Sequence, residues 1–266
     1  MNYWTELSIK FANQKNYLDE LYKVYPISPN LRREISTQSC RAIEEYFTNR
    51  NNVELVKELL KLDLFPIKDS YVPYLRKDKS AIERNPNTVN RIAGNLYAMG
   101  LDVIFDRCSE PIETNRQMGP MFKNWLKSGV FGCKICETEE EFLSTNENVI
   151  YLCSDNKMKD FAIKHLGYTR INKGLDFIAK FNNKYVIAET KFLTDFGGHQ
   201  NDQFEDAIAT LTSPINSNCE KDVIKIAIID GVLYIKGRNK LYNFLQNNSE
   251  LTILSALVLR EFLYSL

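Results

Sequence analysis

Two acidic residues and a lysine stand at suggestive positions in the stretch GLDFIAKFNNKYVIAETKF. Asp176 lies near the start of one predicted strand, and Glu189 and Lys191 lie near the end of the next. Because side chains two apart in a strand point to the same face, Glu189 and Lys191 share one face. The pair Asn182-Asn183 predicts a tight hairpin turn, which places Asp176 almost opposite Glu189. Three ionisable groups are therefore expected to meet at one end of a sheet.

The chemistry expected of this cluster is hydrolysis of a phosphodiester bond. Two carboxylates within a few ångströms repel each other, and the pKa of one rises steeply unless a cation is present. Mg²⁺ suits such a site, because it binds one or two carboxylates together with substrate phosphate and water. Lys191 can then orient or help to deprotonate a water, while the metal stabilises charge on the departing oxygen. The alternative, an exposed cross-strand salt bridge, does not explain why two acids flank one lysine.

The spacing of these residues resembles the PD-(D/E)xK nuclease superfamily and, within it, the type II restriction endonucleases. Asp176 is followed by twelve residues and then by Glu189-Thr190-Lys191, and Leu175 stands where the superfamily usually has proline. The blocks TDFGGHQNDQFEDA, ERNPNTVNRIAGNLYAMGLD and EPIETNRQMGPMFKNWL are similar to segments around the catalytic core of such enzymes. The resemblance implies that Asp176 and Glu189 bind Mg²⁺, that Lys191 is the catalytic lysine, and that the backbone carbonyl of Thr190 is a further metal ligand.

Other polar residues are candidates for contacts with the metal or with DNA. Glu113 is a candidate additional acid of the metal cluster, although a first-turn carboxylate favoured by the helix dipole is the alternative. Arginine pairs with guanine, and amides pair with adenine, so the polar residues in two segments, 115–117 and 200–203, are candidate DNA contacts. For residues 115–117 the alternative is a solvated helix face, and for Asn201 it is a helix cap. These candidate DNA-binding residues are Asn115, Arg116, Gln117, Gln200, Asn201 and Gln203.

Composition limits the class of protein without identifying it. The 34 basic and 34 acidic side chains cancel, which argues against simple coating of DNA but leaves room for a local basic cleft. No apolar run of about 18 residues predicts a membrane span, and the N-terminus lacks a secretory apolar region. We therefore expect an intracellular protein, and the resemblance to restriction endonucleases implies the cytoplasm of a bacterial or archaeal cell.

The six cysteines are expected to be mostly free thiols in that reducing compartment. Cys133 and Cys136 have the spacing of half a zinc site, and only Cys108 and Cys153 are candidates for the other half. Free thiols are the favoured interpretation.

Periodicity along the chain predicts a mainly helical region over residues 1–110 and an α/β core, the expected nuclease core, over residues 111–266. No linker separates the two regions cleanly, so one continuous domain is the open alternative. Ser28-Pro29 predicts the start of a helix that runs to about Phe47. In the core, short strands alternate with helices, and VIKIAIIDGVLYIKG predicts two strands joined at Asp230-Gly231. The expected fold class is a central mixed β-sheet flanked by helices, as in restriction endonucleases.

The function that the resemblance implies is that of a type II restriction endonuclease, which hydrolyses double-stranded DNA at a specific short sequence with Mg²⁺. A homodimer is expected, because a two-fold protein matches a two-fold DNA site. Two alternatives stay open: a repair or recombination nuclease of the same superfamily, and a non-catalytic DNA-binding module.

Overall fold

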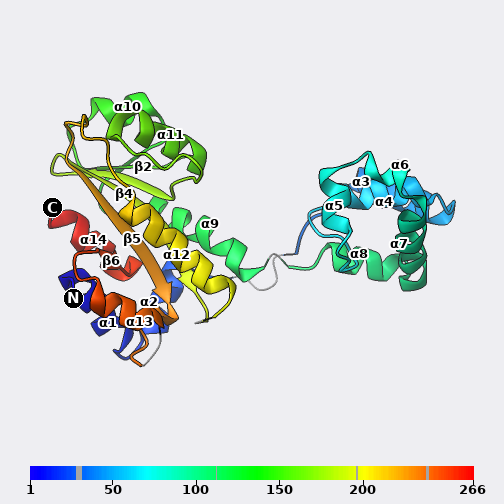
Figure 1. The fold of residues 1–266 in the computed structure, drawn as a ribbon, viewed down its shortest axis with the longest axis horizontal. Coiled ribbons are helices and arrows are strands. Elements are labelled where there is room, and N and C mark those ends of the chain that lie inside the picture. The colour runs from blue at the N-terminus through cyan, green and yellow to red at the C-terminus, as the bar shows by residue number, and fades with distance from the viewer. Residues whose placement is uncertain (28–31, 112, 196, 238–239) are drawn as a thin grey trace. The chain divides into compact units, whose positions relative to one another are not determined.

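The computed structural model describes residues 1–27, 32–111, 113–195, 197–237 and 240–266. The chain forms two compact units (Figure 1). Unit 1 comprises Met1–Ile27 and Thr114–Leu266, and unit 2 comprises Ser28–Glu113.

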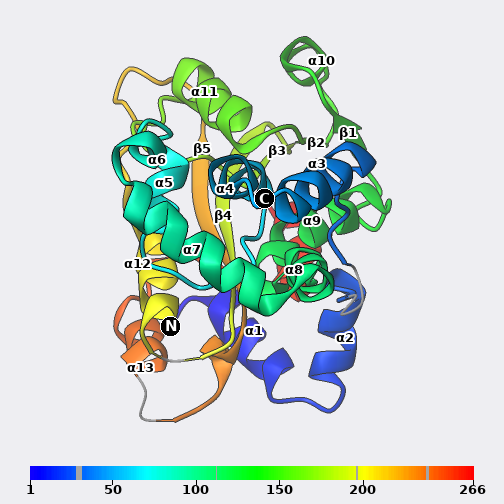
Figure 2. The same cartoon turned by 90° about the vertical axis from the view of Figure 1, so that its right-hand side faces the viewer.

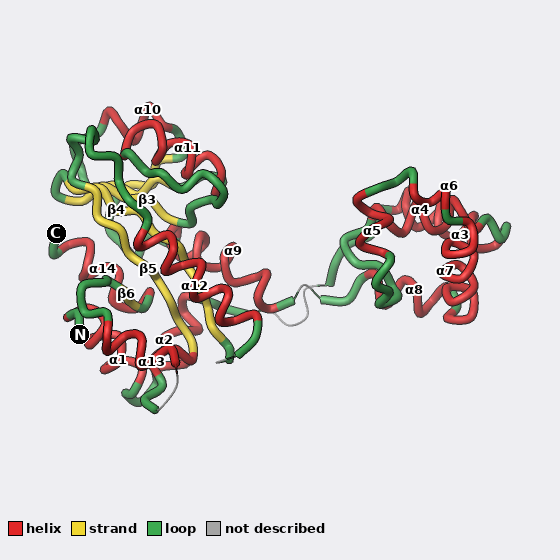
Figure 3. Tube along the Cα trace, viewed as in Figure 1, coloured by secondary structure: helices red, strands yellow, loops and turns green. Residues whose placement is uncertain are grey.

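Unit 1 is built on a six-stranded mixed sheet, as expected from the sequence (Figure 3). The spatial order of its strands follows the chain. The two central pairings, β2 with β3 and β3 with β4, are antiparallel, and the other three are parallel. The strands are β1 (Lys134–Cys136), β2 (Val149–Tyr151), β3 (Phe177–Phe181), β4 (Lys184–Leu193), β5 (Val223–Gly231) and β6 (Ile253–Leu254).

Helices cover both faces of this sheet because alternate side chains of the inner strands are apolar on both sides. In β4, Val186 and Ala188 face one hydrophobic cluster, whereas Ile187 faces another. The first face packs against α2 (Tyr17–Val24), α9 (Thr114–Lys127) and α14 (Ala256–Tyr264). The opposite face is covered by α10 (Glu139–Ser144), α11 (Asp155–Leu166), α12 (His199–Thr212) and α13 (Lys240–Asn247).

The N-terminal helices belong to unit 1, although the sequence predicted them as part of a separate region over residues 1–110. Helix α1 (Tyr3–Ala12) contacts α14 and β6, and α2 contacts α9 and α14. The Thr5 hydroxyl, for example, donates a hydrogen bond of 2.8 Å to the backbone carbonyl of Ile253. The second junction between the units, at Glu113, lies close to the boundary predicted near residue 110.

Unit 2 is helical and has its own hydrophobic core (Figure 2). Gly100, with a φ of 86°, ends the longest helix described in this unit. Nowhere in the described ranges is there a helix with the length and apolar character needed to span a bilayer. The helices of unit 2 are α3 (Thr37–Thr48), α4 (Asn52–Lys61), α5 (Val72–Lys77), α6 (Ala81–Arg84), α7 (Pro86–Met99) and α8 (Leu101–Cys108).

The helix predicted from Ser28-Pro29 to about Phe47 begins at residues that lie outside the described ranges. Helix α3 begins at Thr37, with the Ser36 hydroxyl as its N-cap. Residues 32–36 are not helical, and the N–H of Arg33 donates instead to the carbonyl of Ser109 at 3.2 Å.

The second strand predicted after Asp230-Gly231 is wrong, because residues Val232–Tyr234 form a short 3₁₀ helix. Gly231 has a φ of 92°, and a Cβ there would lie 2.0 Å from the carbonyl oxygen of Leu193. The chain therefore turns away against β4 and does not form a hairpin.

The side chain of Asp230 is fully buried and ties three elements together. Its carboxylate accepts hydrogen bonds from the Tyr25 hydroxyl at 2.8 Å, the Ser255 hydroxyl and the Ala256 N–H at 3.2 Å. Burial raises the pKa of Asp230 to about 6, and the three donors only partly offset that effect. Asp230 thus anchors the end of α2 and the start of α14 to β5.

We expect Asp230 to make the stability of the protein depend on pH. Because folding raises this pKa from its ordinary value of about 4, the stability it contributes is complete below about pH 4 and is lost as pH rises through about 6. In Asp230→Asn the side chain is neutral throughout, so the fall in the free energy of unfolding between pH 4 and 7 should shrink by about 2–3 kcal/mol. Urea denaturation at several pH values measures this.

The matched control is Asp102→Asn, which changes an exposed aspartate at the start of α8. It should leave the pH dependence of the wild type intact. An Asp230→Asn protein with the wild-type slope would contradict the role given to the buried carboxylate.

Candidate active site

The candidate site lies where β4 extends beyond its antiparallel partner. Strand β3 begins at Phe177, which pairs with Ala188, whereas β4 continues to Leu193 and is paired there with β5 on one side. The hairpin predicted at Asn182-Asn183 produces this register, and both residues have the positive φ of a tight turn, 48° and 65°. Residues 189–193 of β4 therefore form an open edge.

Asp176 occupies the place that a continued β3 would fill. Its N–H donates to the carbonyl of Ala188 at 3.2 Å, and its Oδ2 accepts from the N–H of Thr190 at 2.8 Å and from the Thr190 hydroxyl at 3.1 Å. The carboxylate thus satisfies a backbone N–H that the sheet leaves unpaired. As predicted, Asp176 lies opposite Glu189.

Leu175, which stands at the usual proline position of the superfamily, is buried, and its N–H donates to the carbonyl of Asp155 at 3.1 Å. Proline has no N–H and would lose this bond. The departure from the motif therefore has a local structural reason.

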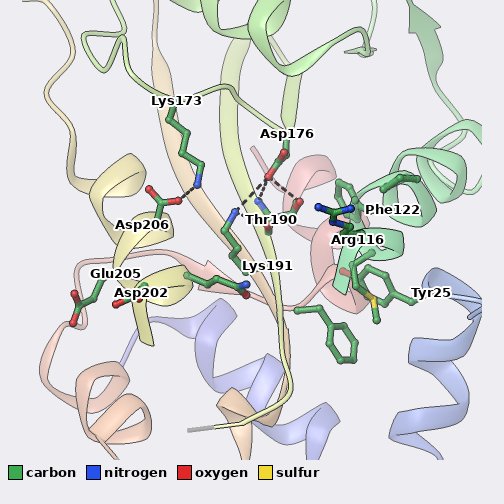
Figure 4. A pocket seen from close by; sticks show the side chains of 15 residues that line it. Tyr25, Arg116, Phe122, Lys173, Asp176, Thr190, Lys191, Asp202, Glu205 and Asp206 are labelled. Carbon is green, nitrogen blue, oxygen red and sulfur yellow. Dashed lines mark hydrogen bonds and ion pairs between the residues drawn. The ribbon is translucent and has the colours of Figure 1, made fainter. Parts of the chain in front are cut away.

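Lys191 is close to both acids, and Figure 4 shows it beside Asp176. Its Nζ is 2.5 Å from Glu189 Oε1 and 4.0 Å from Asp176 Oδ2, and it also donates to the carbonyl of Thr190 at 3.1 Å. Burial and the nearby charge of Glu189 raise the pKa of Asp176 to about 6, while Lys191 acts in the opposite direction. One ammonium therefore does not fully compensate two carboxylates.

A second lysine, which the sequence analysis missed, also reaches Glu189. Lys173 lies on the loop before β3, and its Nζ is 3.2 Å from Glu189 Oε1 and pairs with Asp206 on α12 (Figure 4). Asp206 also pairs with Arg170 at 2.5 Å. Lys173 and Asp206 do not form a recognisable sequence motif, because the loop before β3 and α12 come together only in the folded protein.

Asp176, Lys191, Lys173 and Asp206 line a cavity of about 780 Å³, whereas Glu189, which is only 2% exposed, is not among its lining residues. Carboxylates of α12 and the open edge of β4 form one side, and residues of α9 together with Tyr25 form another (Figure 4). Because Tyr25 donates to Asp230, the buried carboxylate described above also fixes part of the cavity wall. The lining includes Tyr25, Arg116, Phe122, Lys173, Asp176, Thr190, Lys191, Asp202, Gln203, Glu205 and Asp206.

The donor set fits a hard divalent cation. Glu189 is only 2% exposed, and its Oε2 is buried without a hydrogen bond to any described residue. An orphaned carboxylate oxygen is costly unless a cation binds it. Asp176 and the carbonyl of Thr190 are the other candidate oxygen ligands, and three protein oxygens would be sufficient for Mg²⁺ because this ion keeps several waters. No three Cys, His, Asp or Glu side chains gather as ligands in the described part of the chain.

The remaining candidates are placed very differently. Arg116 and Gln203 line the cavity. Gln117 and Gln200 are buried, and the Gln200 Oε1 accepts from the N–H of Thr194 at 3.0 Å, so this amide fixes the backbone after β4. Glu113 belongs to unit 2 and pairs with Arg33 at 2.8 Å.

Asn201 lines a different cavity, between α12 and α13, and its Oδ1 is buried without a hydrogen bond among the residues described. The side chain of Asn115 lies outside the described part of the structure. Cys108 lies in the core of unit 2, whereas Cys133, Cys136 and Cys153 lie in unit 1.

One protein-family model matches the sequence, over residues 2–266, and its description is Tsp45I type II restriction enzyme. No curated protein and no solved structure matches this chain. The family match thus covers both units, including the N-terminal helices that the motif resemblance left unassigned.

We expect Mg²⁺ to stabilise the protein through Glu189. A ligand at about 100 times its Kd adds about 2.7 kcal/mol to the free energy of unfolding, so thermal unfolding should shift upward by about 5–10 °C. In Glu189→Gln the shift should fall below about 1 °C, because the orphaned anionic oxygen is replaced by a neutral amide.

Glu261→Gln, an exposed glutamate of α14, is the matched control and should respond to Mg²⁺ like the wild type. Metal-induced stabilisation that survives in Glu189→Gln would exclude Glu189 as a ligand.

Proposed function

Since the chain belongs to the Tsp45I type II restriction enzyme family, we propose that it cuts double-stranded DNA at a specific short sequence with Mg²⁺ bound at Asp176 and Glu189. Membership of the family makes the chain a restriction endonuclease, and therefore a hydrolase that acts on DNA. The metal, the residues and the sequence specificity are the content of the proposal.

The observation that carries the proposal is the cluster of Asp176, Glu189 and Lys191 at the open edge of β4, where Asp176 and Lys191 line a cavity. The ammonium of Lys191 lies within 4.0 Å of an oxygen of each carboxylate. From there it can donate a hydrogen bond to a water and orient that water toward a phosphate. An ion pair that served stability alone would not need an orphaned oxygen on Glu189.

Asp176, Glu189 and the carbonyl of Thr190 would hold the metal. When bound, Mg²⁺ polarises the scissile phosphate and stabilises negative charge on it. Asp176 is held in place for this by two hydrogen bonds from Thr190, and Glu189 by two ammonium groups.

Lys173 is proposed as a positioning residue. It links Glu189 to Asp206 and so connects the open edge of β4 to α12. It also supplies the second positive charge beside two acids that one lysine does not fully compensate.

A homodimer belongs to the proposal as well. Two identical sites related by a two-fold axis would cut the two strands of a symmetric DNA sequence.

Digestion of phage DNA with Mg²⁺, followed by mapping of the ends, tests the proposal. We expect discrete fragments, and we expect Lys191→Ala to cut at least about 10²- to 10³-fold more slowly, as when a transition-state contact is removed. Lys164→Ala, which breaks an exposed ion pair with Glu139, is the matched control and should cut normally.

A smear or a preference for branched DNA would favour a repair or recombination nuclease. Binding without cleavage in the wild type would favour a non-catalytic module, and unchanged cutting by Lys191→Ala would remove the catalytic assignment.

Lys173→Ala should lower the single-turnover cleavage rate by about tenfold, because Glu189 loses one of its two cationic partners. Lys173→Arg should recover most of the rate by keeping the charge. Since Lys164→Ala again serves as the control, a rate in Lys173→Ala equal to that of the control would show that the Lys173 pair is only structural.

A further inference from the structure

Helix α7 of unit 2 presents a polar face that its packing does not explain. One side of α7 is fully buried in the core of unit 2 through Val89, Ile92, Ala93 and Leu96. The opposite side is exposed, and its members recur three or four positions apart, so they form one continuous stripe. This exposed face consists of Asn87, Asn90, Arg91, Gly94, Asn95 and Ala98.

The exposed face of α7 carries no carboxylate. The sequence of α7, PNTVNRIAGNLYAM, contains no acidic residue, as is also true of the short helix α5, whereas α3, α4, α6 and α8 each contain at least one. Neither does it carry a large apolar side chain that would suit a protein partner. The exposed face of α7 therefore combines one arginine with several asparagine amides. Such a surface suits a negatively charged partner that also offers hydrogen-bonding groups.

Arg91 is held in a defined orientation while it stays accessible. Its guanidinium donates to Asp69 Oδ2 at 2.7 Å and lies over the ring of Tyr71, 5.6 Å from the ring centroid. The Arg91 side chain is nevertheless 46% exposed, whereas that of Asp69 is 9% exposed. A guanidinium oriented in this way loses less conformational entropy when it binds a ligand.

Asn90 is oriented by a comparable network. The Asn52 Nδ2 donates to Asn90 Oδ1 at 2.8 Å, and the Tyr97 hydroxyl donates to Asn52 Oδ1 at 2.9 Å. The amide on the exposed face is therefore presented in a defined direction.

Gly94 lies in the middle of the same stripe. A Cβ built at Gly94 would meet no atom within 4 Å, so packing within the chain does not require a glycine there. Glycine weakens a helix interior relative to alanine. Its benefit at this position is that another molecule can approach the helix backbone closely.

We propose that α7 enters the major groove of the DNA that the active site cleaves and reads its base edges. The inference rests on the proposed function and adds the element that selects the sequence. With 14 residues α7 is about 21 Å long, and the major groove is about 12 Å wide and admits a helix. Arg91 suits O6 and N7 of guanine, and the asparagines suit N6 and N7 of adenine.

The test compares binding to two duplexes of equal length, one with the mapped cleavage sequence and one with it scrambled. Binding is measured by fluorescence anisotropy in the Lys191→Ala background, so that cleavage does not interfere. Introducing Arg91→Ala should weaken binding to the first duplex about 10- to 100-fold and to the second by less than about twofold. Asn95→Ala should act in the same direction.

Arg107→Ala, which removes an exposed arginine from α8 of the same unit, is the matched control and should change neither affinity. Circular dichroism reports whether the variants fold. If loss of the Asp69 pair unfolds Arg91→Ala, the result for Asn95→Ala decides, because no contact of Asn95 supports the core.

Retention of the wild-type ratio between the two duplexes by the folded variants would overturn the assignment of α7. Equal losses on both duplexes would overturn it too, because they would indicate contacts to phosphates and not to bases. If the wild-type enzyme cuts no DNA, the proposed function fails and this inference fails with it. If the enzyme cuts discrete sites and the variants still discriminate, only the assignment of α7 fails.

Discussion

The candidate active site depends on the extension of β4 beyond the end of β3. Beyond Ala188 the edge of β4 has no antiparallel partner, so its backbone groups need other hydrogen bonds. Asp176 supplies one of them by accepting from the N–H of Thr190. The same bond holds the carboxylate of Asp176 beside the side chains of Glu189 and Lys191. These two residues are two positions apart in β4, so they point to the same face. The cluster of Asp176, Glu189 and Lys191 thus forms where β4 lacks an antiparallel partner.

The charged side chains beside this open edge of β4 form a network of ion pairs. Glu189 is almost fully buried, and Asp176 has a raised pKa because it shares this environment. Lys191 and Lys173 both approach Glu189 Oε1, and Asp206 in turn holds Lys173. The two lysines converge on one oxygen of Glu189 and leave the other without a partner among the described residues. That asymmetry suits a site that binds a cation and positions a phosphate.

The division of the chain separates two tasks that the proposals assign to it. Unit 1 contains the open edge, the cavity and the buried Asp230, which fixes Tyr25 at the cavity wall. Unit 2 has its own core and presents the carboxylate-free face of α7. Because each unit buries its own apolar side chains, the surface of α7 is free to change without disturbing the packing around Glu189.

The sequence by itself determined the mixed sheet, the hairpin at Asn182-Asn183 and the placement of Asp176 opposite Glu189. These features depend on local signals, namely alternating apolar residues and a turn that requires positive φ. Only the tertiary structure decided that Lys173 and Asp206 join the site, because the loop before β3 and α12 are distant in the chain. It also decided that the N-terminal helices pack in unit 1 and that Gly231 ends a strand. Those outcomes arise from long-range packing, which no local pattern encodes.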